Sequence, residues 1–595
     1  KKVKDDPDNP FGSLIKAGGQ SYYIDADGKR QLSLINKRAE EGDWGEWADK
    51  LPSQFLSKQS LSLVNKQLNL AASDKMAEFD EICSLTNPTV KKSLLKSFAD
   101  DCDSAAVHLQ AAALPRQKYQ VILPITSMKD NEVYAPNYKN GETVALVRYP
   151  HGGTFEIPIL TVNNKQADAR KLLGADAFDA VGINSKVAER LSGADFDGDT
   201  VMCIPTHDRG GRVKITSTPP LKGLEGFDPK MAYPEVKGMK VMKNTQTEMG
   251  KISNLITDMT LQGAPQDELA AAVRHSMVVI DAEKHHLNYK QSEMDNNISA
   301  LKKKYQAHVD DNGNVHYGGA ATLLSRAKGE TPVLKRQGTP QINMKGKDWY
   351  DPSKPEGSLI YKTADDVAYE INGKVKYRTQ KSTKMAETDN AYNLISDANT
   401  PMERAYADYA NKMKSLANQA RKEIMTTGKI KYSATAKATY QPEVDSLMAK
   451  LNTALLNAPR ERQAQLLANA EVNAKKAENK DMKPADIKKA SQRALSKYRS
   501  ELGSVARRDR SIKVTDKEWE AIQAGAISEN VLMKILANTD SDSLRQKATP
   551  KTTNTISTVQ ANRIKAMRAS NYTIDEIARA LGVSTATITK YSKGA

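Results

Sequence analysis

The feature that most constrains the fold is a block of short β-type runs inside a chain whose other segments are patterned mainly for helices. From about Gln120 to Pro205, short apolar runs alternate with turn dipeptides such as Asn140-Gly141 and Gly152-Gly153. Runs bounded in this way are typical of strands. They are Val121–Pro124, Val133–Ala135, Thr143–Val147 and Phe155–Val162. The sequence therefore predicts a compact β domain that ends near Pro205.

Periodicity and composition divide the rest of the chain into segments around this β domain, and the fold class they predict is α+β. The segments are a helical lead-in at 1–115, the β domain at 116–207, a connector with helices at 208–306, a basic region of loops and short strands at 307–383, a helical region at 384–545 and a C-terminal module at 556–595. Within them we expect a hairpin at about 21–28, helical segments at about 54–113, 243–260 and 265–306, and a helix break near 479–484.

The charge of the chain favours a polyanionic partner. Its 595 residues include 88 Lys and Arg against 72 Asp and Glu, which gives a formal net charge of +16. Such an excess suits nucleic acid better than an acidic substrate surface. No stretch approaches the ~20 apolar residues that cross a bilayer, so we expect no membrane partner. The three cysteines show no CxxC pair or zinc-like spacing, so the sequence does not favour a disulfide scaffold or a zinc module.

The first residues of the sequence indicate where in the cell the protein is expected. It reads Lys1-Lys2-Val3-Lys4, without a Met and without an apolar leader. Secretion therefore finds no support, and we expect a protein of a reducing cytoplasm whose natural gene begins further upstream.

The strongest chemical motif is Asp195-Phe196-Asp197-Gly198-Asp199. In a regular strand the outer carboxylates would stand about 13 Å apart at ~3.3 Å per residue, too far to share an ion whose oxygen bonds are ~2.1 Å long. Gly198 can adopt positive φ, and the resulting turn would bring Asp195, Asp197 and Asp199 together, with Phe196 on the opposite side. Oxygen ligands without His or Cys indicate Mg²⁺, or alternatively Mn²⁺.

Three kinds of structure compete with a catalytic metal site for the acidic motif. A calcium EF-hand would need Gly and Glu where this chain has Thr200 and Thr206, which excludes it. An aspartyl-phosphate phosphotransferase would use Asp197 as nucleophile and Asp199 as acid/base, but Arg190–Ala194 is a poor apolar strand to precede it. A solvated acidic turn does not account for the apolar residues that follow directly. Metal-ion catalysis is therefore favoured, and the last two alternatives stay open.

The acidic motif resembles the catalytic loop of the two-barrel RNA polymerases, a superfamily that includes the beta-prime subunit of cellular enzymes, the RNA-silencing polymerases and single-chain polymerases of prophages. In that family the loop belongs to a double-psi β-barrel, and a strand ending in Arg-x-Pro precedes it, as Arg148-Tyr149-Pro150 does here. The similarity covers about residues 45–300 and includes Leu51–Gln59 and Phe79–Arg116 of the lead-in. It implies a double-psi barrel at 116–207 and an RNA polymerase of phage or mobile-element type, in a bacterial or phage-infected cell.

The resemblance also implies a mechanism, nucleotidyl transfer. One divalent ion would be held by Asp195, Asp197 and Asp199, and a second would arrive with the nucleoside triphosphate. Arg148 would contact the sugar of the incoming nucleotide or of the transcript end, although a strand-end ion pair is the ordinary alternative. Three residues fall where such polymerases place cleft-lining helices and would touch triphosphate or template, unless they are ordinary helix-face residues: Lys251, His275 and Lys284. The implied partners are a DNA template, the RNA product and nucleoside triphosphates.

One departure from the family limits this expectation. The first barrel of such enzymes supplies basic residues, and nothing in residues 1–115 has the strand pattern of that barrel. Either upstream sequence or a second chain would have to provide it. Other functions stay open: an RNA-directed RNA polymerase, a metal-dependent phosphohydrolase or nuclease, and a non-catalytic DNA-binding regulator.

The C-terminal module is predicted to be a helix-turn-helix, similar to those of resolvases and mobile-element proteins. A basic helix at Val559–Ala569 is followed by Thr573–Leu581, a Gly-containing turn and a helix Thr585–Tyr591 capped by Ser584. From Ser543 to Ala595 there are nine Lys and Arg against two Asp and Glu, which favours DNA binding over a packing appendage. The last helix would enter the major groove and present Ser584, Thr585, Thr587, Thr589 and Lys590.

Overall fold

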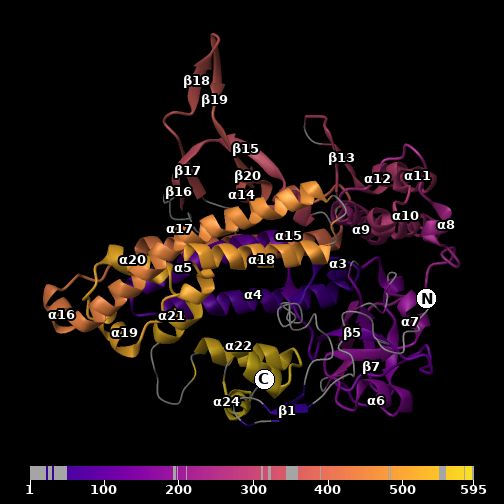
Figure 1. Cartoon of the computed structure of the whole chain (residues 1–595), viewed down its shortest axis with the longest axis horizontal. Coiled ribbons are helices and arrows are strands. Elements are labelled where there is room, and N and C mark those ends of the chain that lie inside the picture. The colour runs from indigo at the N-terminus through magenta and orange to yellow at the C-terminus, as the bar shows by residue number, and fades with distance from the viewer. Residues whose placement is uncertain are drawn as a thin grey trace. The chain divides into compact units, whose positions relative to one another are not determined.

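The structure, a computed structural model, is an α+β protein (Figure 1). It describes residues 22–24, 28, 30–32, 50–149, 151–191, 194, 196, 198–208, 211–309, 312–318, 323–342, 359–388, 390–479, 482, 484–548, 556, 558–581 and 583–592. The chain forms two compact units, one of Lys1–Lys75, Cys102–Ser415 and Gln560–Ala595 and one of Met76–Asp101 and Leu416–Val559. Among the described helices, none is both long and apolar enough to span a membrane.

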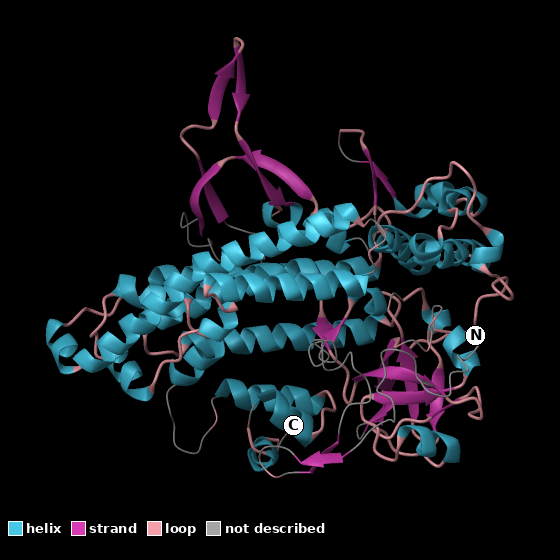
Figure 2. Ribbon diagram, in the orientation of Figure 1, coloured by secondary structure: helices cyan, strands magenta, loops and turns pink. Residues whose placement is uncertain are grey.

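The first unit contains a nearly closed six-stranded barrel where the β domain was predicted (Figure 2). In spatial order the strands are β6 (Glu132–Val133), β8 (Ile159–Val162), β7 (Thr143–Val147), β10 (Thr200–Pro205), β5 (Lys118–Pro124) and β9 (Ala180–Ile183). The pairs β6–β8 and β5–β9 are parallel, and the other neighbours are antiparallel. Tyr134, which follows β6, forms an antiparallel bridge with Gly182 of β9 through backbone hydrogen bonds of 2.9 Å. This bridge joins the two edges of the sheet.

The barrel is held together by one apolar interior to which every strand contributes. Alternate residues of a strand point to the same side, and the inward positions are fully or almost fully buried. They include Ile122, Val133, Leu146, Leu160, Val181 and Val201. The outer side of β5 packs on α6 (Ala167–Leu173). Each buried aliphatic side chain contributes about 1.5–3 kcal/mol, so the residues at the strand ends are mounted on a rigid frame.

The predicted strand runs are confirmed in part. The runs at Val121–Pro124 and Thr143–Val147 lie in β5 and β7. The run expected from Phe155 is wrong at its start, because Thr154–Glu156 is a 3-10 turn and β8 begins only at Ile159. Proline cannot donate to a ladder, and Pro158 separates the turn from the strand. The four-residue strand β9 was not predicted.

Helices follow the barrel in the first unit. After β11 (His207–Asp208), β12 (Gly211–Arg212) and α8 (Pro229–Ala232) comes α9 (Thr245–Leu261), close to its predicted range. The helical segment expected at 265–306 is divided into α10 (Gln266–His285), α11 (Tyr289–Asp295) and α12 (Ile298–Gln306). His286 and Asn297 stand at these breaks with φ of +53° and +51°, a left-handed conformation that ends a helix.

The lead-in and the second unit are mainly helical, as predicted. The lead-in holds β1 (Tyr22–Ile24) paired with β2 (Arg30–Leu32), β3 (Lys50–Leu51) paired with β4 (Ala111–Ala112), and helices α3 (Ser53–Leu56), α4 (Leu61–Cys83) and α5 (Pro88–His108). Later helices are α15 (Pro401–Thr426), α16 (Ala434–Thr439), α17 (Gln441–Glu478), α18 (Pro484–Leu502), α19 (Asp516–Gln523), α20 (Glu529–Ala537) and α21 (Ser541–Ala548). The predicted break lies between the end of α17 and the start of α18, and an ion pair of 2.6 Å between Glu461 and Arg499 joins the two helices.

The basic region of the first unit consists of two-stranded antiparallel ribbons. They are β13 (Ala307–Val309) with β14 (Val315–Tyr317), β15 (Glu330–Leu334) with β20 (Thr379–Thr383), β16 (Arg336–Ile342) with β17 (Leu359–Thr363), and β18 (Ala368–Ile371) with β19 (Lys374–Tyr377). Two short helices, α13 (Leu323–Lys328) and α14 (Lys384–Glu387), flank the β15–β20 ribbon in sequence.

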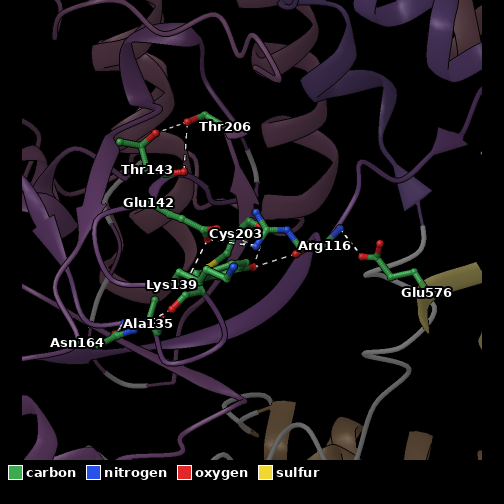
Figure 3. Close-up of polar contacts among 10 residues, drawn as sticks. Arg116, Ala135, Lys139, Glu142, Thr143, Asn164, Cys203, Thr206 and Glu576 are labelled. Atoms are coloured by element: carbon green, nitrogen blue, oxygen red, sulfur yellow. Dashed lines mark hydrogen bonds and ion pairs between the residues drawn. The ribbon is translucent and has the colours of Figure 1, made fainter. Parts of the chain in front are cut away.

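The described residues of the C-terminal module form three short helices: α22 (Thr558–Ala569), α23 (Ile574–Leu581) and α24 (Thr585–Tyr591). One isoleucine from each, Ile564, Ile577 and Ile588, is fully buried. Figure 3 shows how the module meets the barrel entry: the backbone N–H of Arg116 donates to Glu576 of α23, while the Arg116 guanidinium pairs with Glu142 at 3.1 Å.

Candidate functional site

Arg148 and Asp199, both predicted for the site, form an ion pair. Arg148 follows the last residue of β7, and Asp199 precedes the first residue of β10, the antiparallel neighbour of β7. The end of one strand therefore lies beside the start of the other, at one rim of the barrel. Nη2 of Arg148 is 3.0 Å from Oδ2 of Asp199, and the side chains are 13% and 19% exposed. The pair is largely shielded but still reaches the surface.

The acidic loop lies between α7 (Ser185–Glu189) and β10. Gly198 has a φ of +107°, which confirms the predicted positive φ and turns the chain just before Asp199. Phe196 packs against the barrel core, which anchors the middle of the loop. Asp195 and Asp197 lie outside the described residues, so Asp199 is the predicted ligand that the structure places.

The chemistry of this donor fits a hard divalent cation, because carboxylate oxygen is the ligand that Mg²⁺ prefers. A carboxylate also offers several acceptor positions, so one group can serve both an arginine and a cation. Over the residues that the structure describes, no group of three His, Cys, Asp or Glu side chains is arranged to hold a metal. Asp195 and Asp197 are not among those residues.

The loop that begins at Arg148 is held by the lead-in, in a contact that the sequence did not predict. Nζ of Lys58 donates to the carbonyl oxygen of His151 at 2.8 Å, and the backbone N–H of His151 donates to Oε1 of Gln54 at 3.2 Å. Both backbone groups of His151 are thus satisfied by side chains of one short segment. The segment fixes the path of the chain three residues beyond Arg148.

Lys58 and His151 are buried ionisable groups. Lys58 is 4% exposed, and burial lowers its pKa to about 7 although the carboxylates of Glu156 and Asp258 act to raise it. Burial, with the charge of Lys58 added, holds the pKa of His151 well below its usual range. Among the described residues, neither ring nitrogen of His151 has a hydrogen-bond partner. His151 is therefore neutral at physiological pH, and Lys58 titrates near neutrality.

The same segment makes two further anchoring contacts within the first unit. Oγ of Ser57 lies 2.6 Å from Oη of Tyr406 in α15, and Tyr406 also donates to the carbonyl of Ser53 at 3.1 Å. The amide of Gln59 accepts from the N–H of Thr216 at 2.7 Å and donates to its carbonyl at 3.4 Å. These contacts explain why the run Leu51–Gln59 contains polar side chains. In the sequence, the polar residues close to Phe55 and Leu56 are the pattern that could have indicated these contacts.

The other predicted substrate contacts lie on α9 and α10. Lys251 is exposed and pairs with Glu248 at 2.8 Å, and Lys284 is exposed in the last turn of α10. His275 is 6% exposed, its Nδ1 lies 3.0 Å from Oγ of Ser292, and burial lowers its pKa to about 4. The structure thus brings Arg148 and Asp199 together, whereas His275 joins α10 to α11.

The predicted DNA-contacting residues lie on α24 and its cap. Ser584 accepts from the N–H of Thr587 at 3.2 Å, which confirms the predicted cap. Ser584, Thr585, Thr589 and Lys590 are exposed, and Thr587 is half-buried. Four of the five side chains are therefore open to a partner.

The comparisons with known proteins are negative. No family model matches the sequence, and a search of curated proteins finds no significant match.

Proposed function

We propose that the chain is a metal-dependent nucleotidyltransferase, a DNA-directed RNA polymerase-like protein of phage or mobile-element type whose barrel is the catalytic part. The observation that supports this most is the Arg148–Asp199 ion pair of 3.0 Å at one rim of the barrel. The two residues come from motifs far apart in the sequence; the role of Arg148 rests on the family resemblance, and a strand-end ion pair is also its ordinary alternative.

In this proposal Asp199, with Asp195 and Asp197, holds Mg²⁺. The ion supplies activation of a 3′-hydroxyl and stabilisation of the leaving pyrophosphate. Arg148 presents a planar, permanently charged guanidinium that orients Asp199 and donates to the sugar of the nucleotide. Gln54 and Lys58 keep the backbone after Arg148 in place, which matters because small misplacements of a positioning group are costly in rate.

The finer fold assignments belong to the same proposal. We infer a double-psi barrel, supported by the six-strand order with two parallel pairs and an acidic loop that leads into β10. We infer a helix-turn-helix at 556–595, supported by three helices that share a small core. Basic residues of a second barrel, from upstream sequence or a partner chain, complete the site in this view.

The direct test is incorporation of labelled ribonucleotides on single-stranded DNA with Mg²⁺. The intact chain is compared with Asp197→Ala, Asp199→Asn and the control Asp176→Asn. Asp176 is an exposed acid that precedes β9 in the sequence and belongs to neither of the two motifs. We expect Mg²⁺-dependent extension that falls at least 100-fold in the first two variants and stays within twofold in the control, since removing a metal ligand removes transition-state stabilisation.

Different results would redirect the assignment. Strand shortening in place of extension would indicate a nuclease, and extension on RNA but not on DNA would indicate an RNA-directed enzyme. No extension by the intact chain would exclude a self-sufficient polymerase. Binding of Mn²⁺, followed by its paramagnetic signal, tests the metal site independently of turnover, and the signal of bound ion should be lost in Asp199→Asn but not in Asp176→Asn.

A further inference from the structure

The β18–β19 ribbon of the basic region is exposed over most of its length. Figure 1 shows it at the end of a branch, beyond the β15–β20 ribbon. Its turn is Asn372-Gly373, with φ of +52° and +70°, the dipeptide that a two-residue hairpin loop favours. Residues 370–379 are all exposed. The ribbon is therefore well specified by its turn but is not covered by the other residues that the structure describes.

The register assigns different residues to the two faces of the ribbon. Tyr369 is opposite Lys376, and Ile371 is opposite Lys374. Directly opposed residues share a face, so these four residues form one face, which we call the lysine face. The opposite face holds Ala368, Glu370, Val375 and Tyr377. Glu370 is the one acid in 368–377, so the charge of the lysine face is purely cationic over this range.

Two physical arguments indicate that the ribbon has a partner. An isolated two-stranded hairpin is only marginally stable in water, and this one leaves Ile371, Val375 and Tyr377 45%, 62% and 59% exposed. Exposed apolar side chains mark interaction sites, but Val375 and Tyr377 lie on the opposite face and Ile371 on the lysine face. The choice of face therefore rests on Lys374 and Lys376. At the base of the ribbon, the guanidinium of Arg378 lies 5.7 Å from the ring centroid of Tyr369 and pairs with Asp366. This contact holds Tyr369 in place on the lysine face.

We propose that the lysine face of the β18–β19 ribbon binds duplex nucleic acid, with the ribbon in the major groove. Two strands ~4.8 Å apart fit a groove about 12 Å wide, which is known to admit a two-stranded ribbon. Lys374 and Lys376 contact phosphates, and Tyr369 and Ile371 pack against the groove. The net charge of +16 is complementary to such a partner. The inference rests on the proposed function for its role, that of holding the template duplex, but the binding itself needs no catalysis.

The test measures binding of a short labelled DNA duplex to the full chain by fluorescence anisotropy over a range of KCl concentrations. EDTA is present, so the result does not depend on whether Asp199 supports nucleotide addition. Each phosphate contact contributes about 0.9 to the slope of log K against log salt. Lys374→Gln with Lys376→Gln should therefore reduce that slope by about 1.8. The matched control, Val375→Thr with Tyr377→Thr, changes the opposite face and keeps good strand formers.

The control should bind within twofold of the unchanged chain. An unchanged salt slope in the lysine variant, or an equal loss in the control, would overturn the proposal. Tighter binding of the corresponding single strand through the same lysines would overturn the duplex assignment. Repeating the comparison in a Lys590→Gln background separates the ribbon from α24, since the two effects on the slope should add if the surfaces are independent.

Discussion

At the residue scale, Lys58 explains more of the site than sequence reasoning could assign to it. A lysine in a polar run is usually a solvated side chain, and the run Leu51–Gln59 alone does not show which residues pack against it. In the structure Lys58 is buried and donates to His151, three residues after Arg148. Its position depends on a contact between segments far apart in the chain, which local patterns do not encode.

The buried position of Lys58 predicts a specific dependence of stability on pH. Its pKa is lowered from 10.5 to about 7 on folding, so between these pH values the unfolded chain binds a proton that the folded chain does not. Stability should therefore rise with pH across this window, by up to about 1.4 kcal/mol per pH unit. Lys58→Met should remove this component. Scanning calorimetry of the chain and the variant from pH 7 to 10 measures the difference.

The control for Lys58 is Lys251→Met, which changes an exposed lysine on α9. Its difference from the unchanged chain should vary little with pH. If Lys58→Met and Lys251→Met gave parallel pH profiles, Lys58 would not be buried in the way the structure describes. Lys58→Met should also lower nucleotide addition relative to the unchanged chain, because the carbonyl of His151 loses its donor.

At the scale of elements, the turn before β10 depends on Gly198. Its φ of +107° is a conformation that L side chains rarely adopt, so Gly198→Ala should destabilise the loop by about 1–3 kcal/mol and weaken Mn²⁺ binding. Local hydrogen exchange of peptides spanning the loop and β10 measures the first effect. Gly250→Ala is the control, because a Cβ there meets nothing within 4 Å and alanine favours a helix interior by about 0.5–1 kcal/mol. Unchanged exchange in Gly198→Ala would contradict the assigned turn.

The elements also show what the sequence could and could not predict. Long apolar or turn-bounded runs, such as β5, β7 and the α17–α18 break, were located correctly because their patterns are local. The short strand β9 was missed because Ala180–Ile183 has no alternation to distinguish it. The acidic loop and Arg148 were found as motifs, but their meeting at 3.0 Å depends on the antiparallel pairing of β7 and β10. Pairing between strands some fifty residues apart, as this one is, follows from the barrel and not from either motif.

At the scale of the whole molecule, the C-terminal module is both docked and exposed. Within the first unit, Arg563 of α22 donates to the carbonyl of Asp74 at 3.0 Å, and Tyr572 donates to the carbonyl of Ala113. Glu576 accepts from the backbone N–H of Arg116, at the entry to β5, while it also caps α23 through Thr573. The last helix, α24, takes no part in these contacts. The module therefore uses one surface to hold the barrel entry and leaves another for a partner.

Because the module docks through one surface and exposes another, we expect variants to change docking and DNA binding separately. The double variant Arg563→Met with Tyr572→Phe removes docking contacts but keeps the packing volume. It loses two partly buried hydrogen bonds worth about 1 kcal/mol each. Hydrogen exchange of the Arg116 amide should therefore become at least tenfold faster. The affinity of this variant for duplex DNA should change less than twofold. Lys590→Gln should do the reverse: it leaves exchange at Arg116 unchanged and lowers the salt slope of DNA binding by about 0.9. If either variant produced both effects, the docked and exposed surfaces would be one coupled surface, and DNA binding by α24 would be linked directly to the strand that leads into the site.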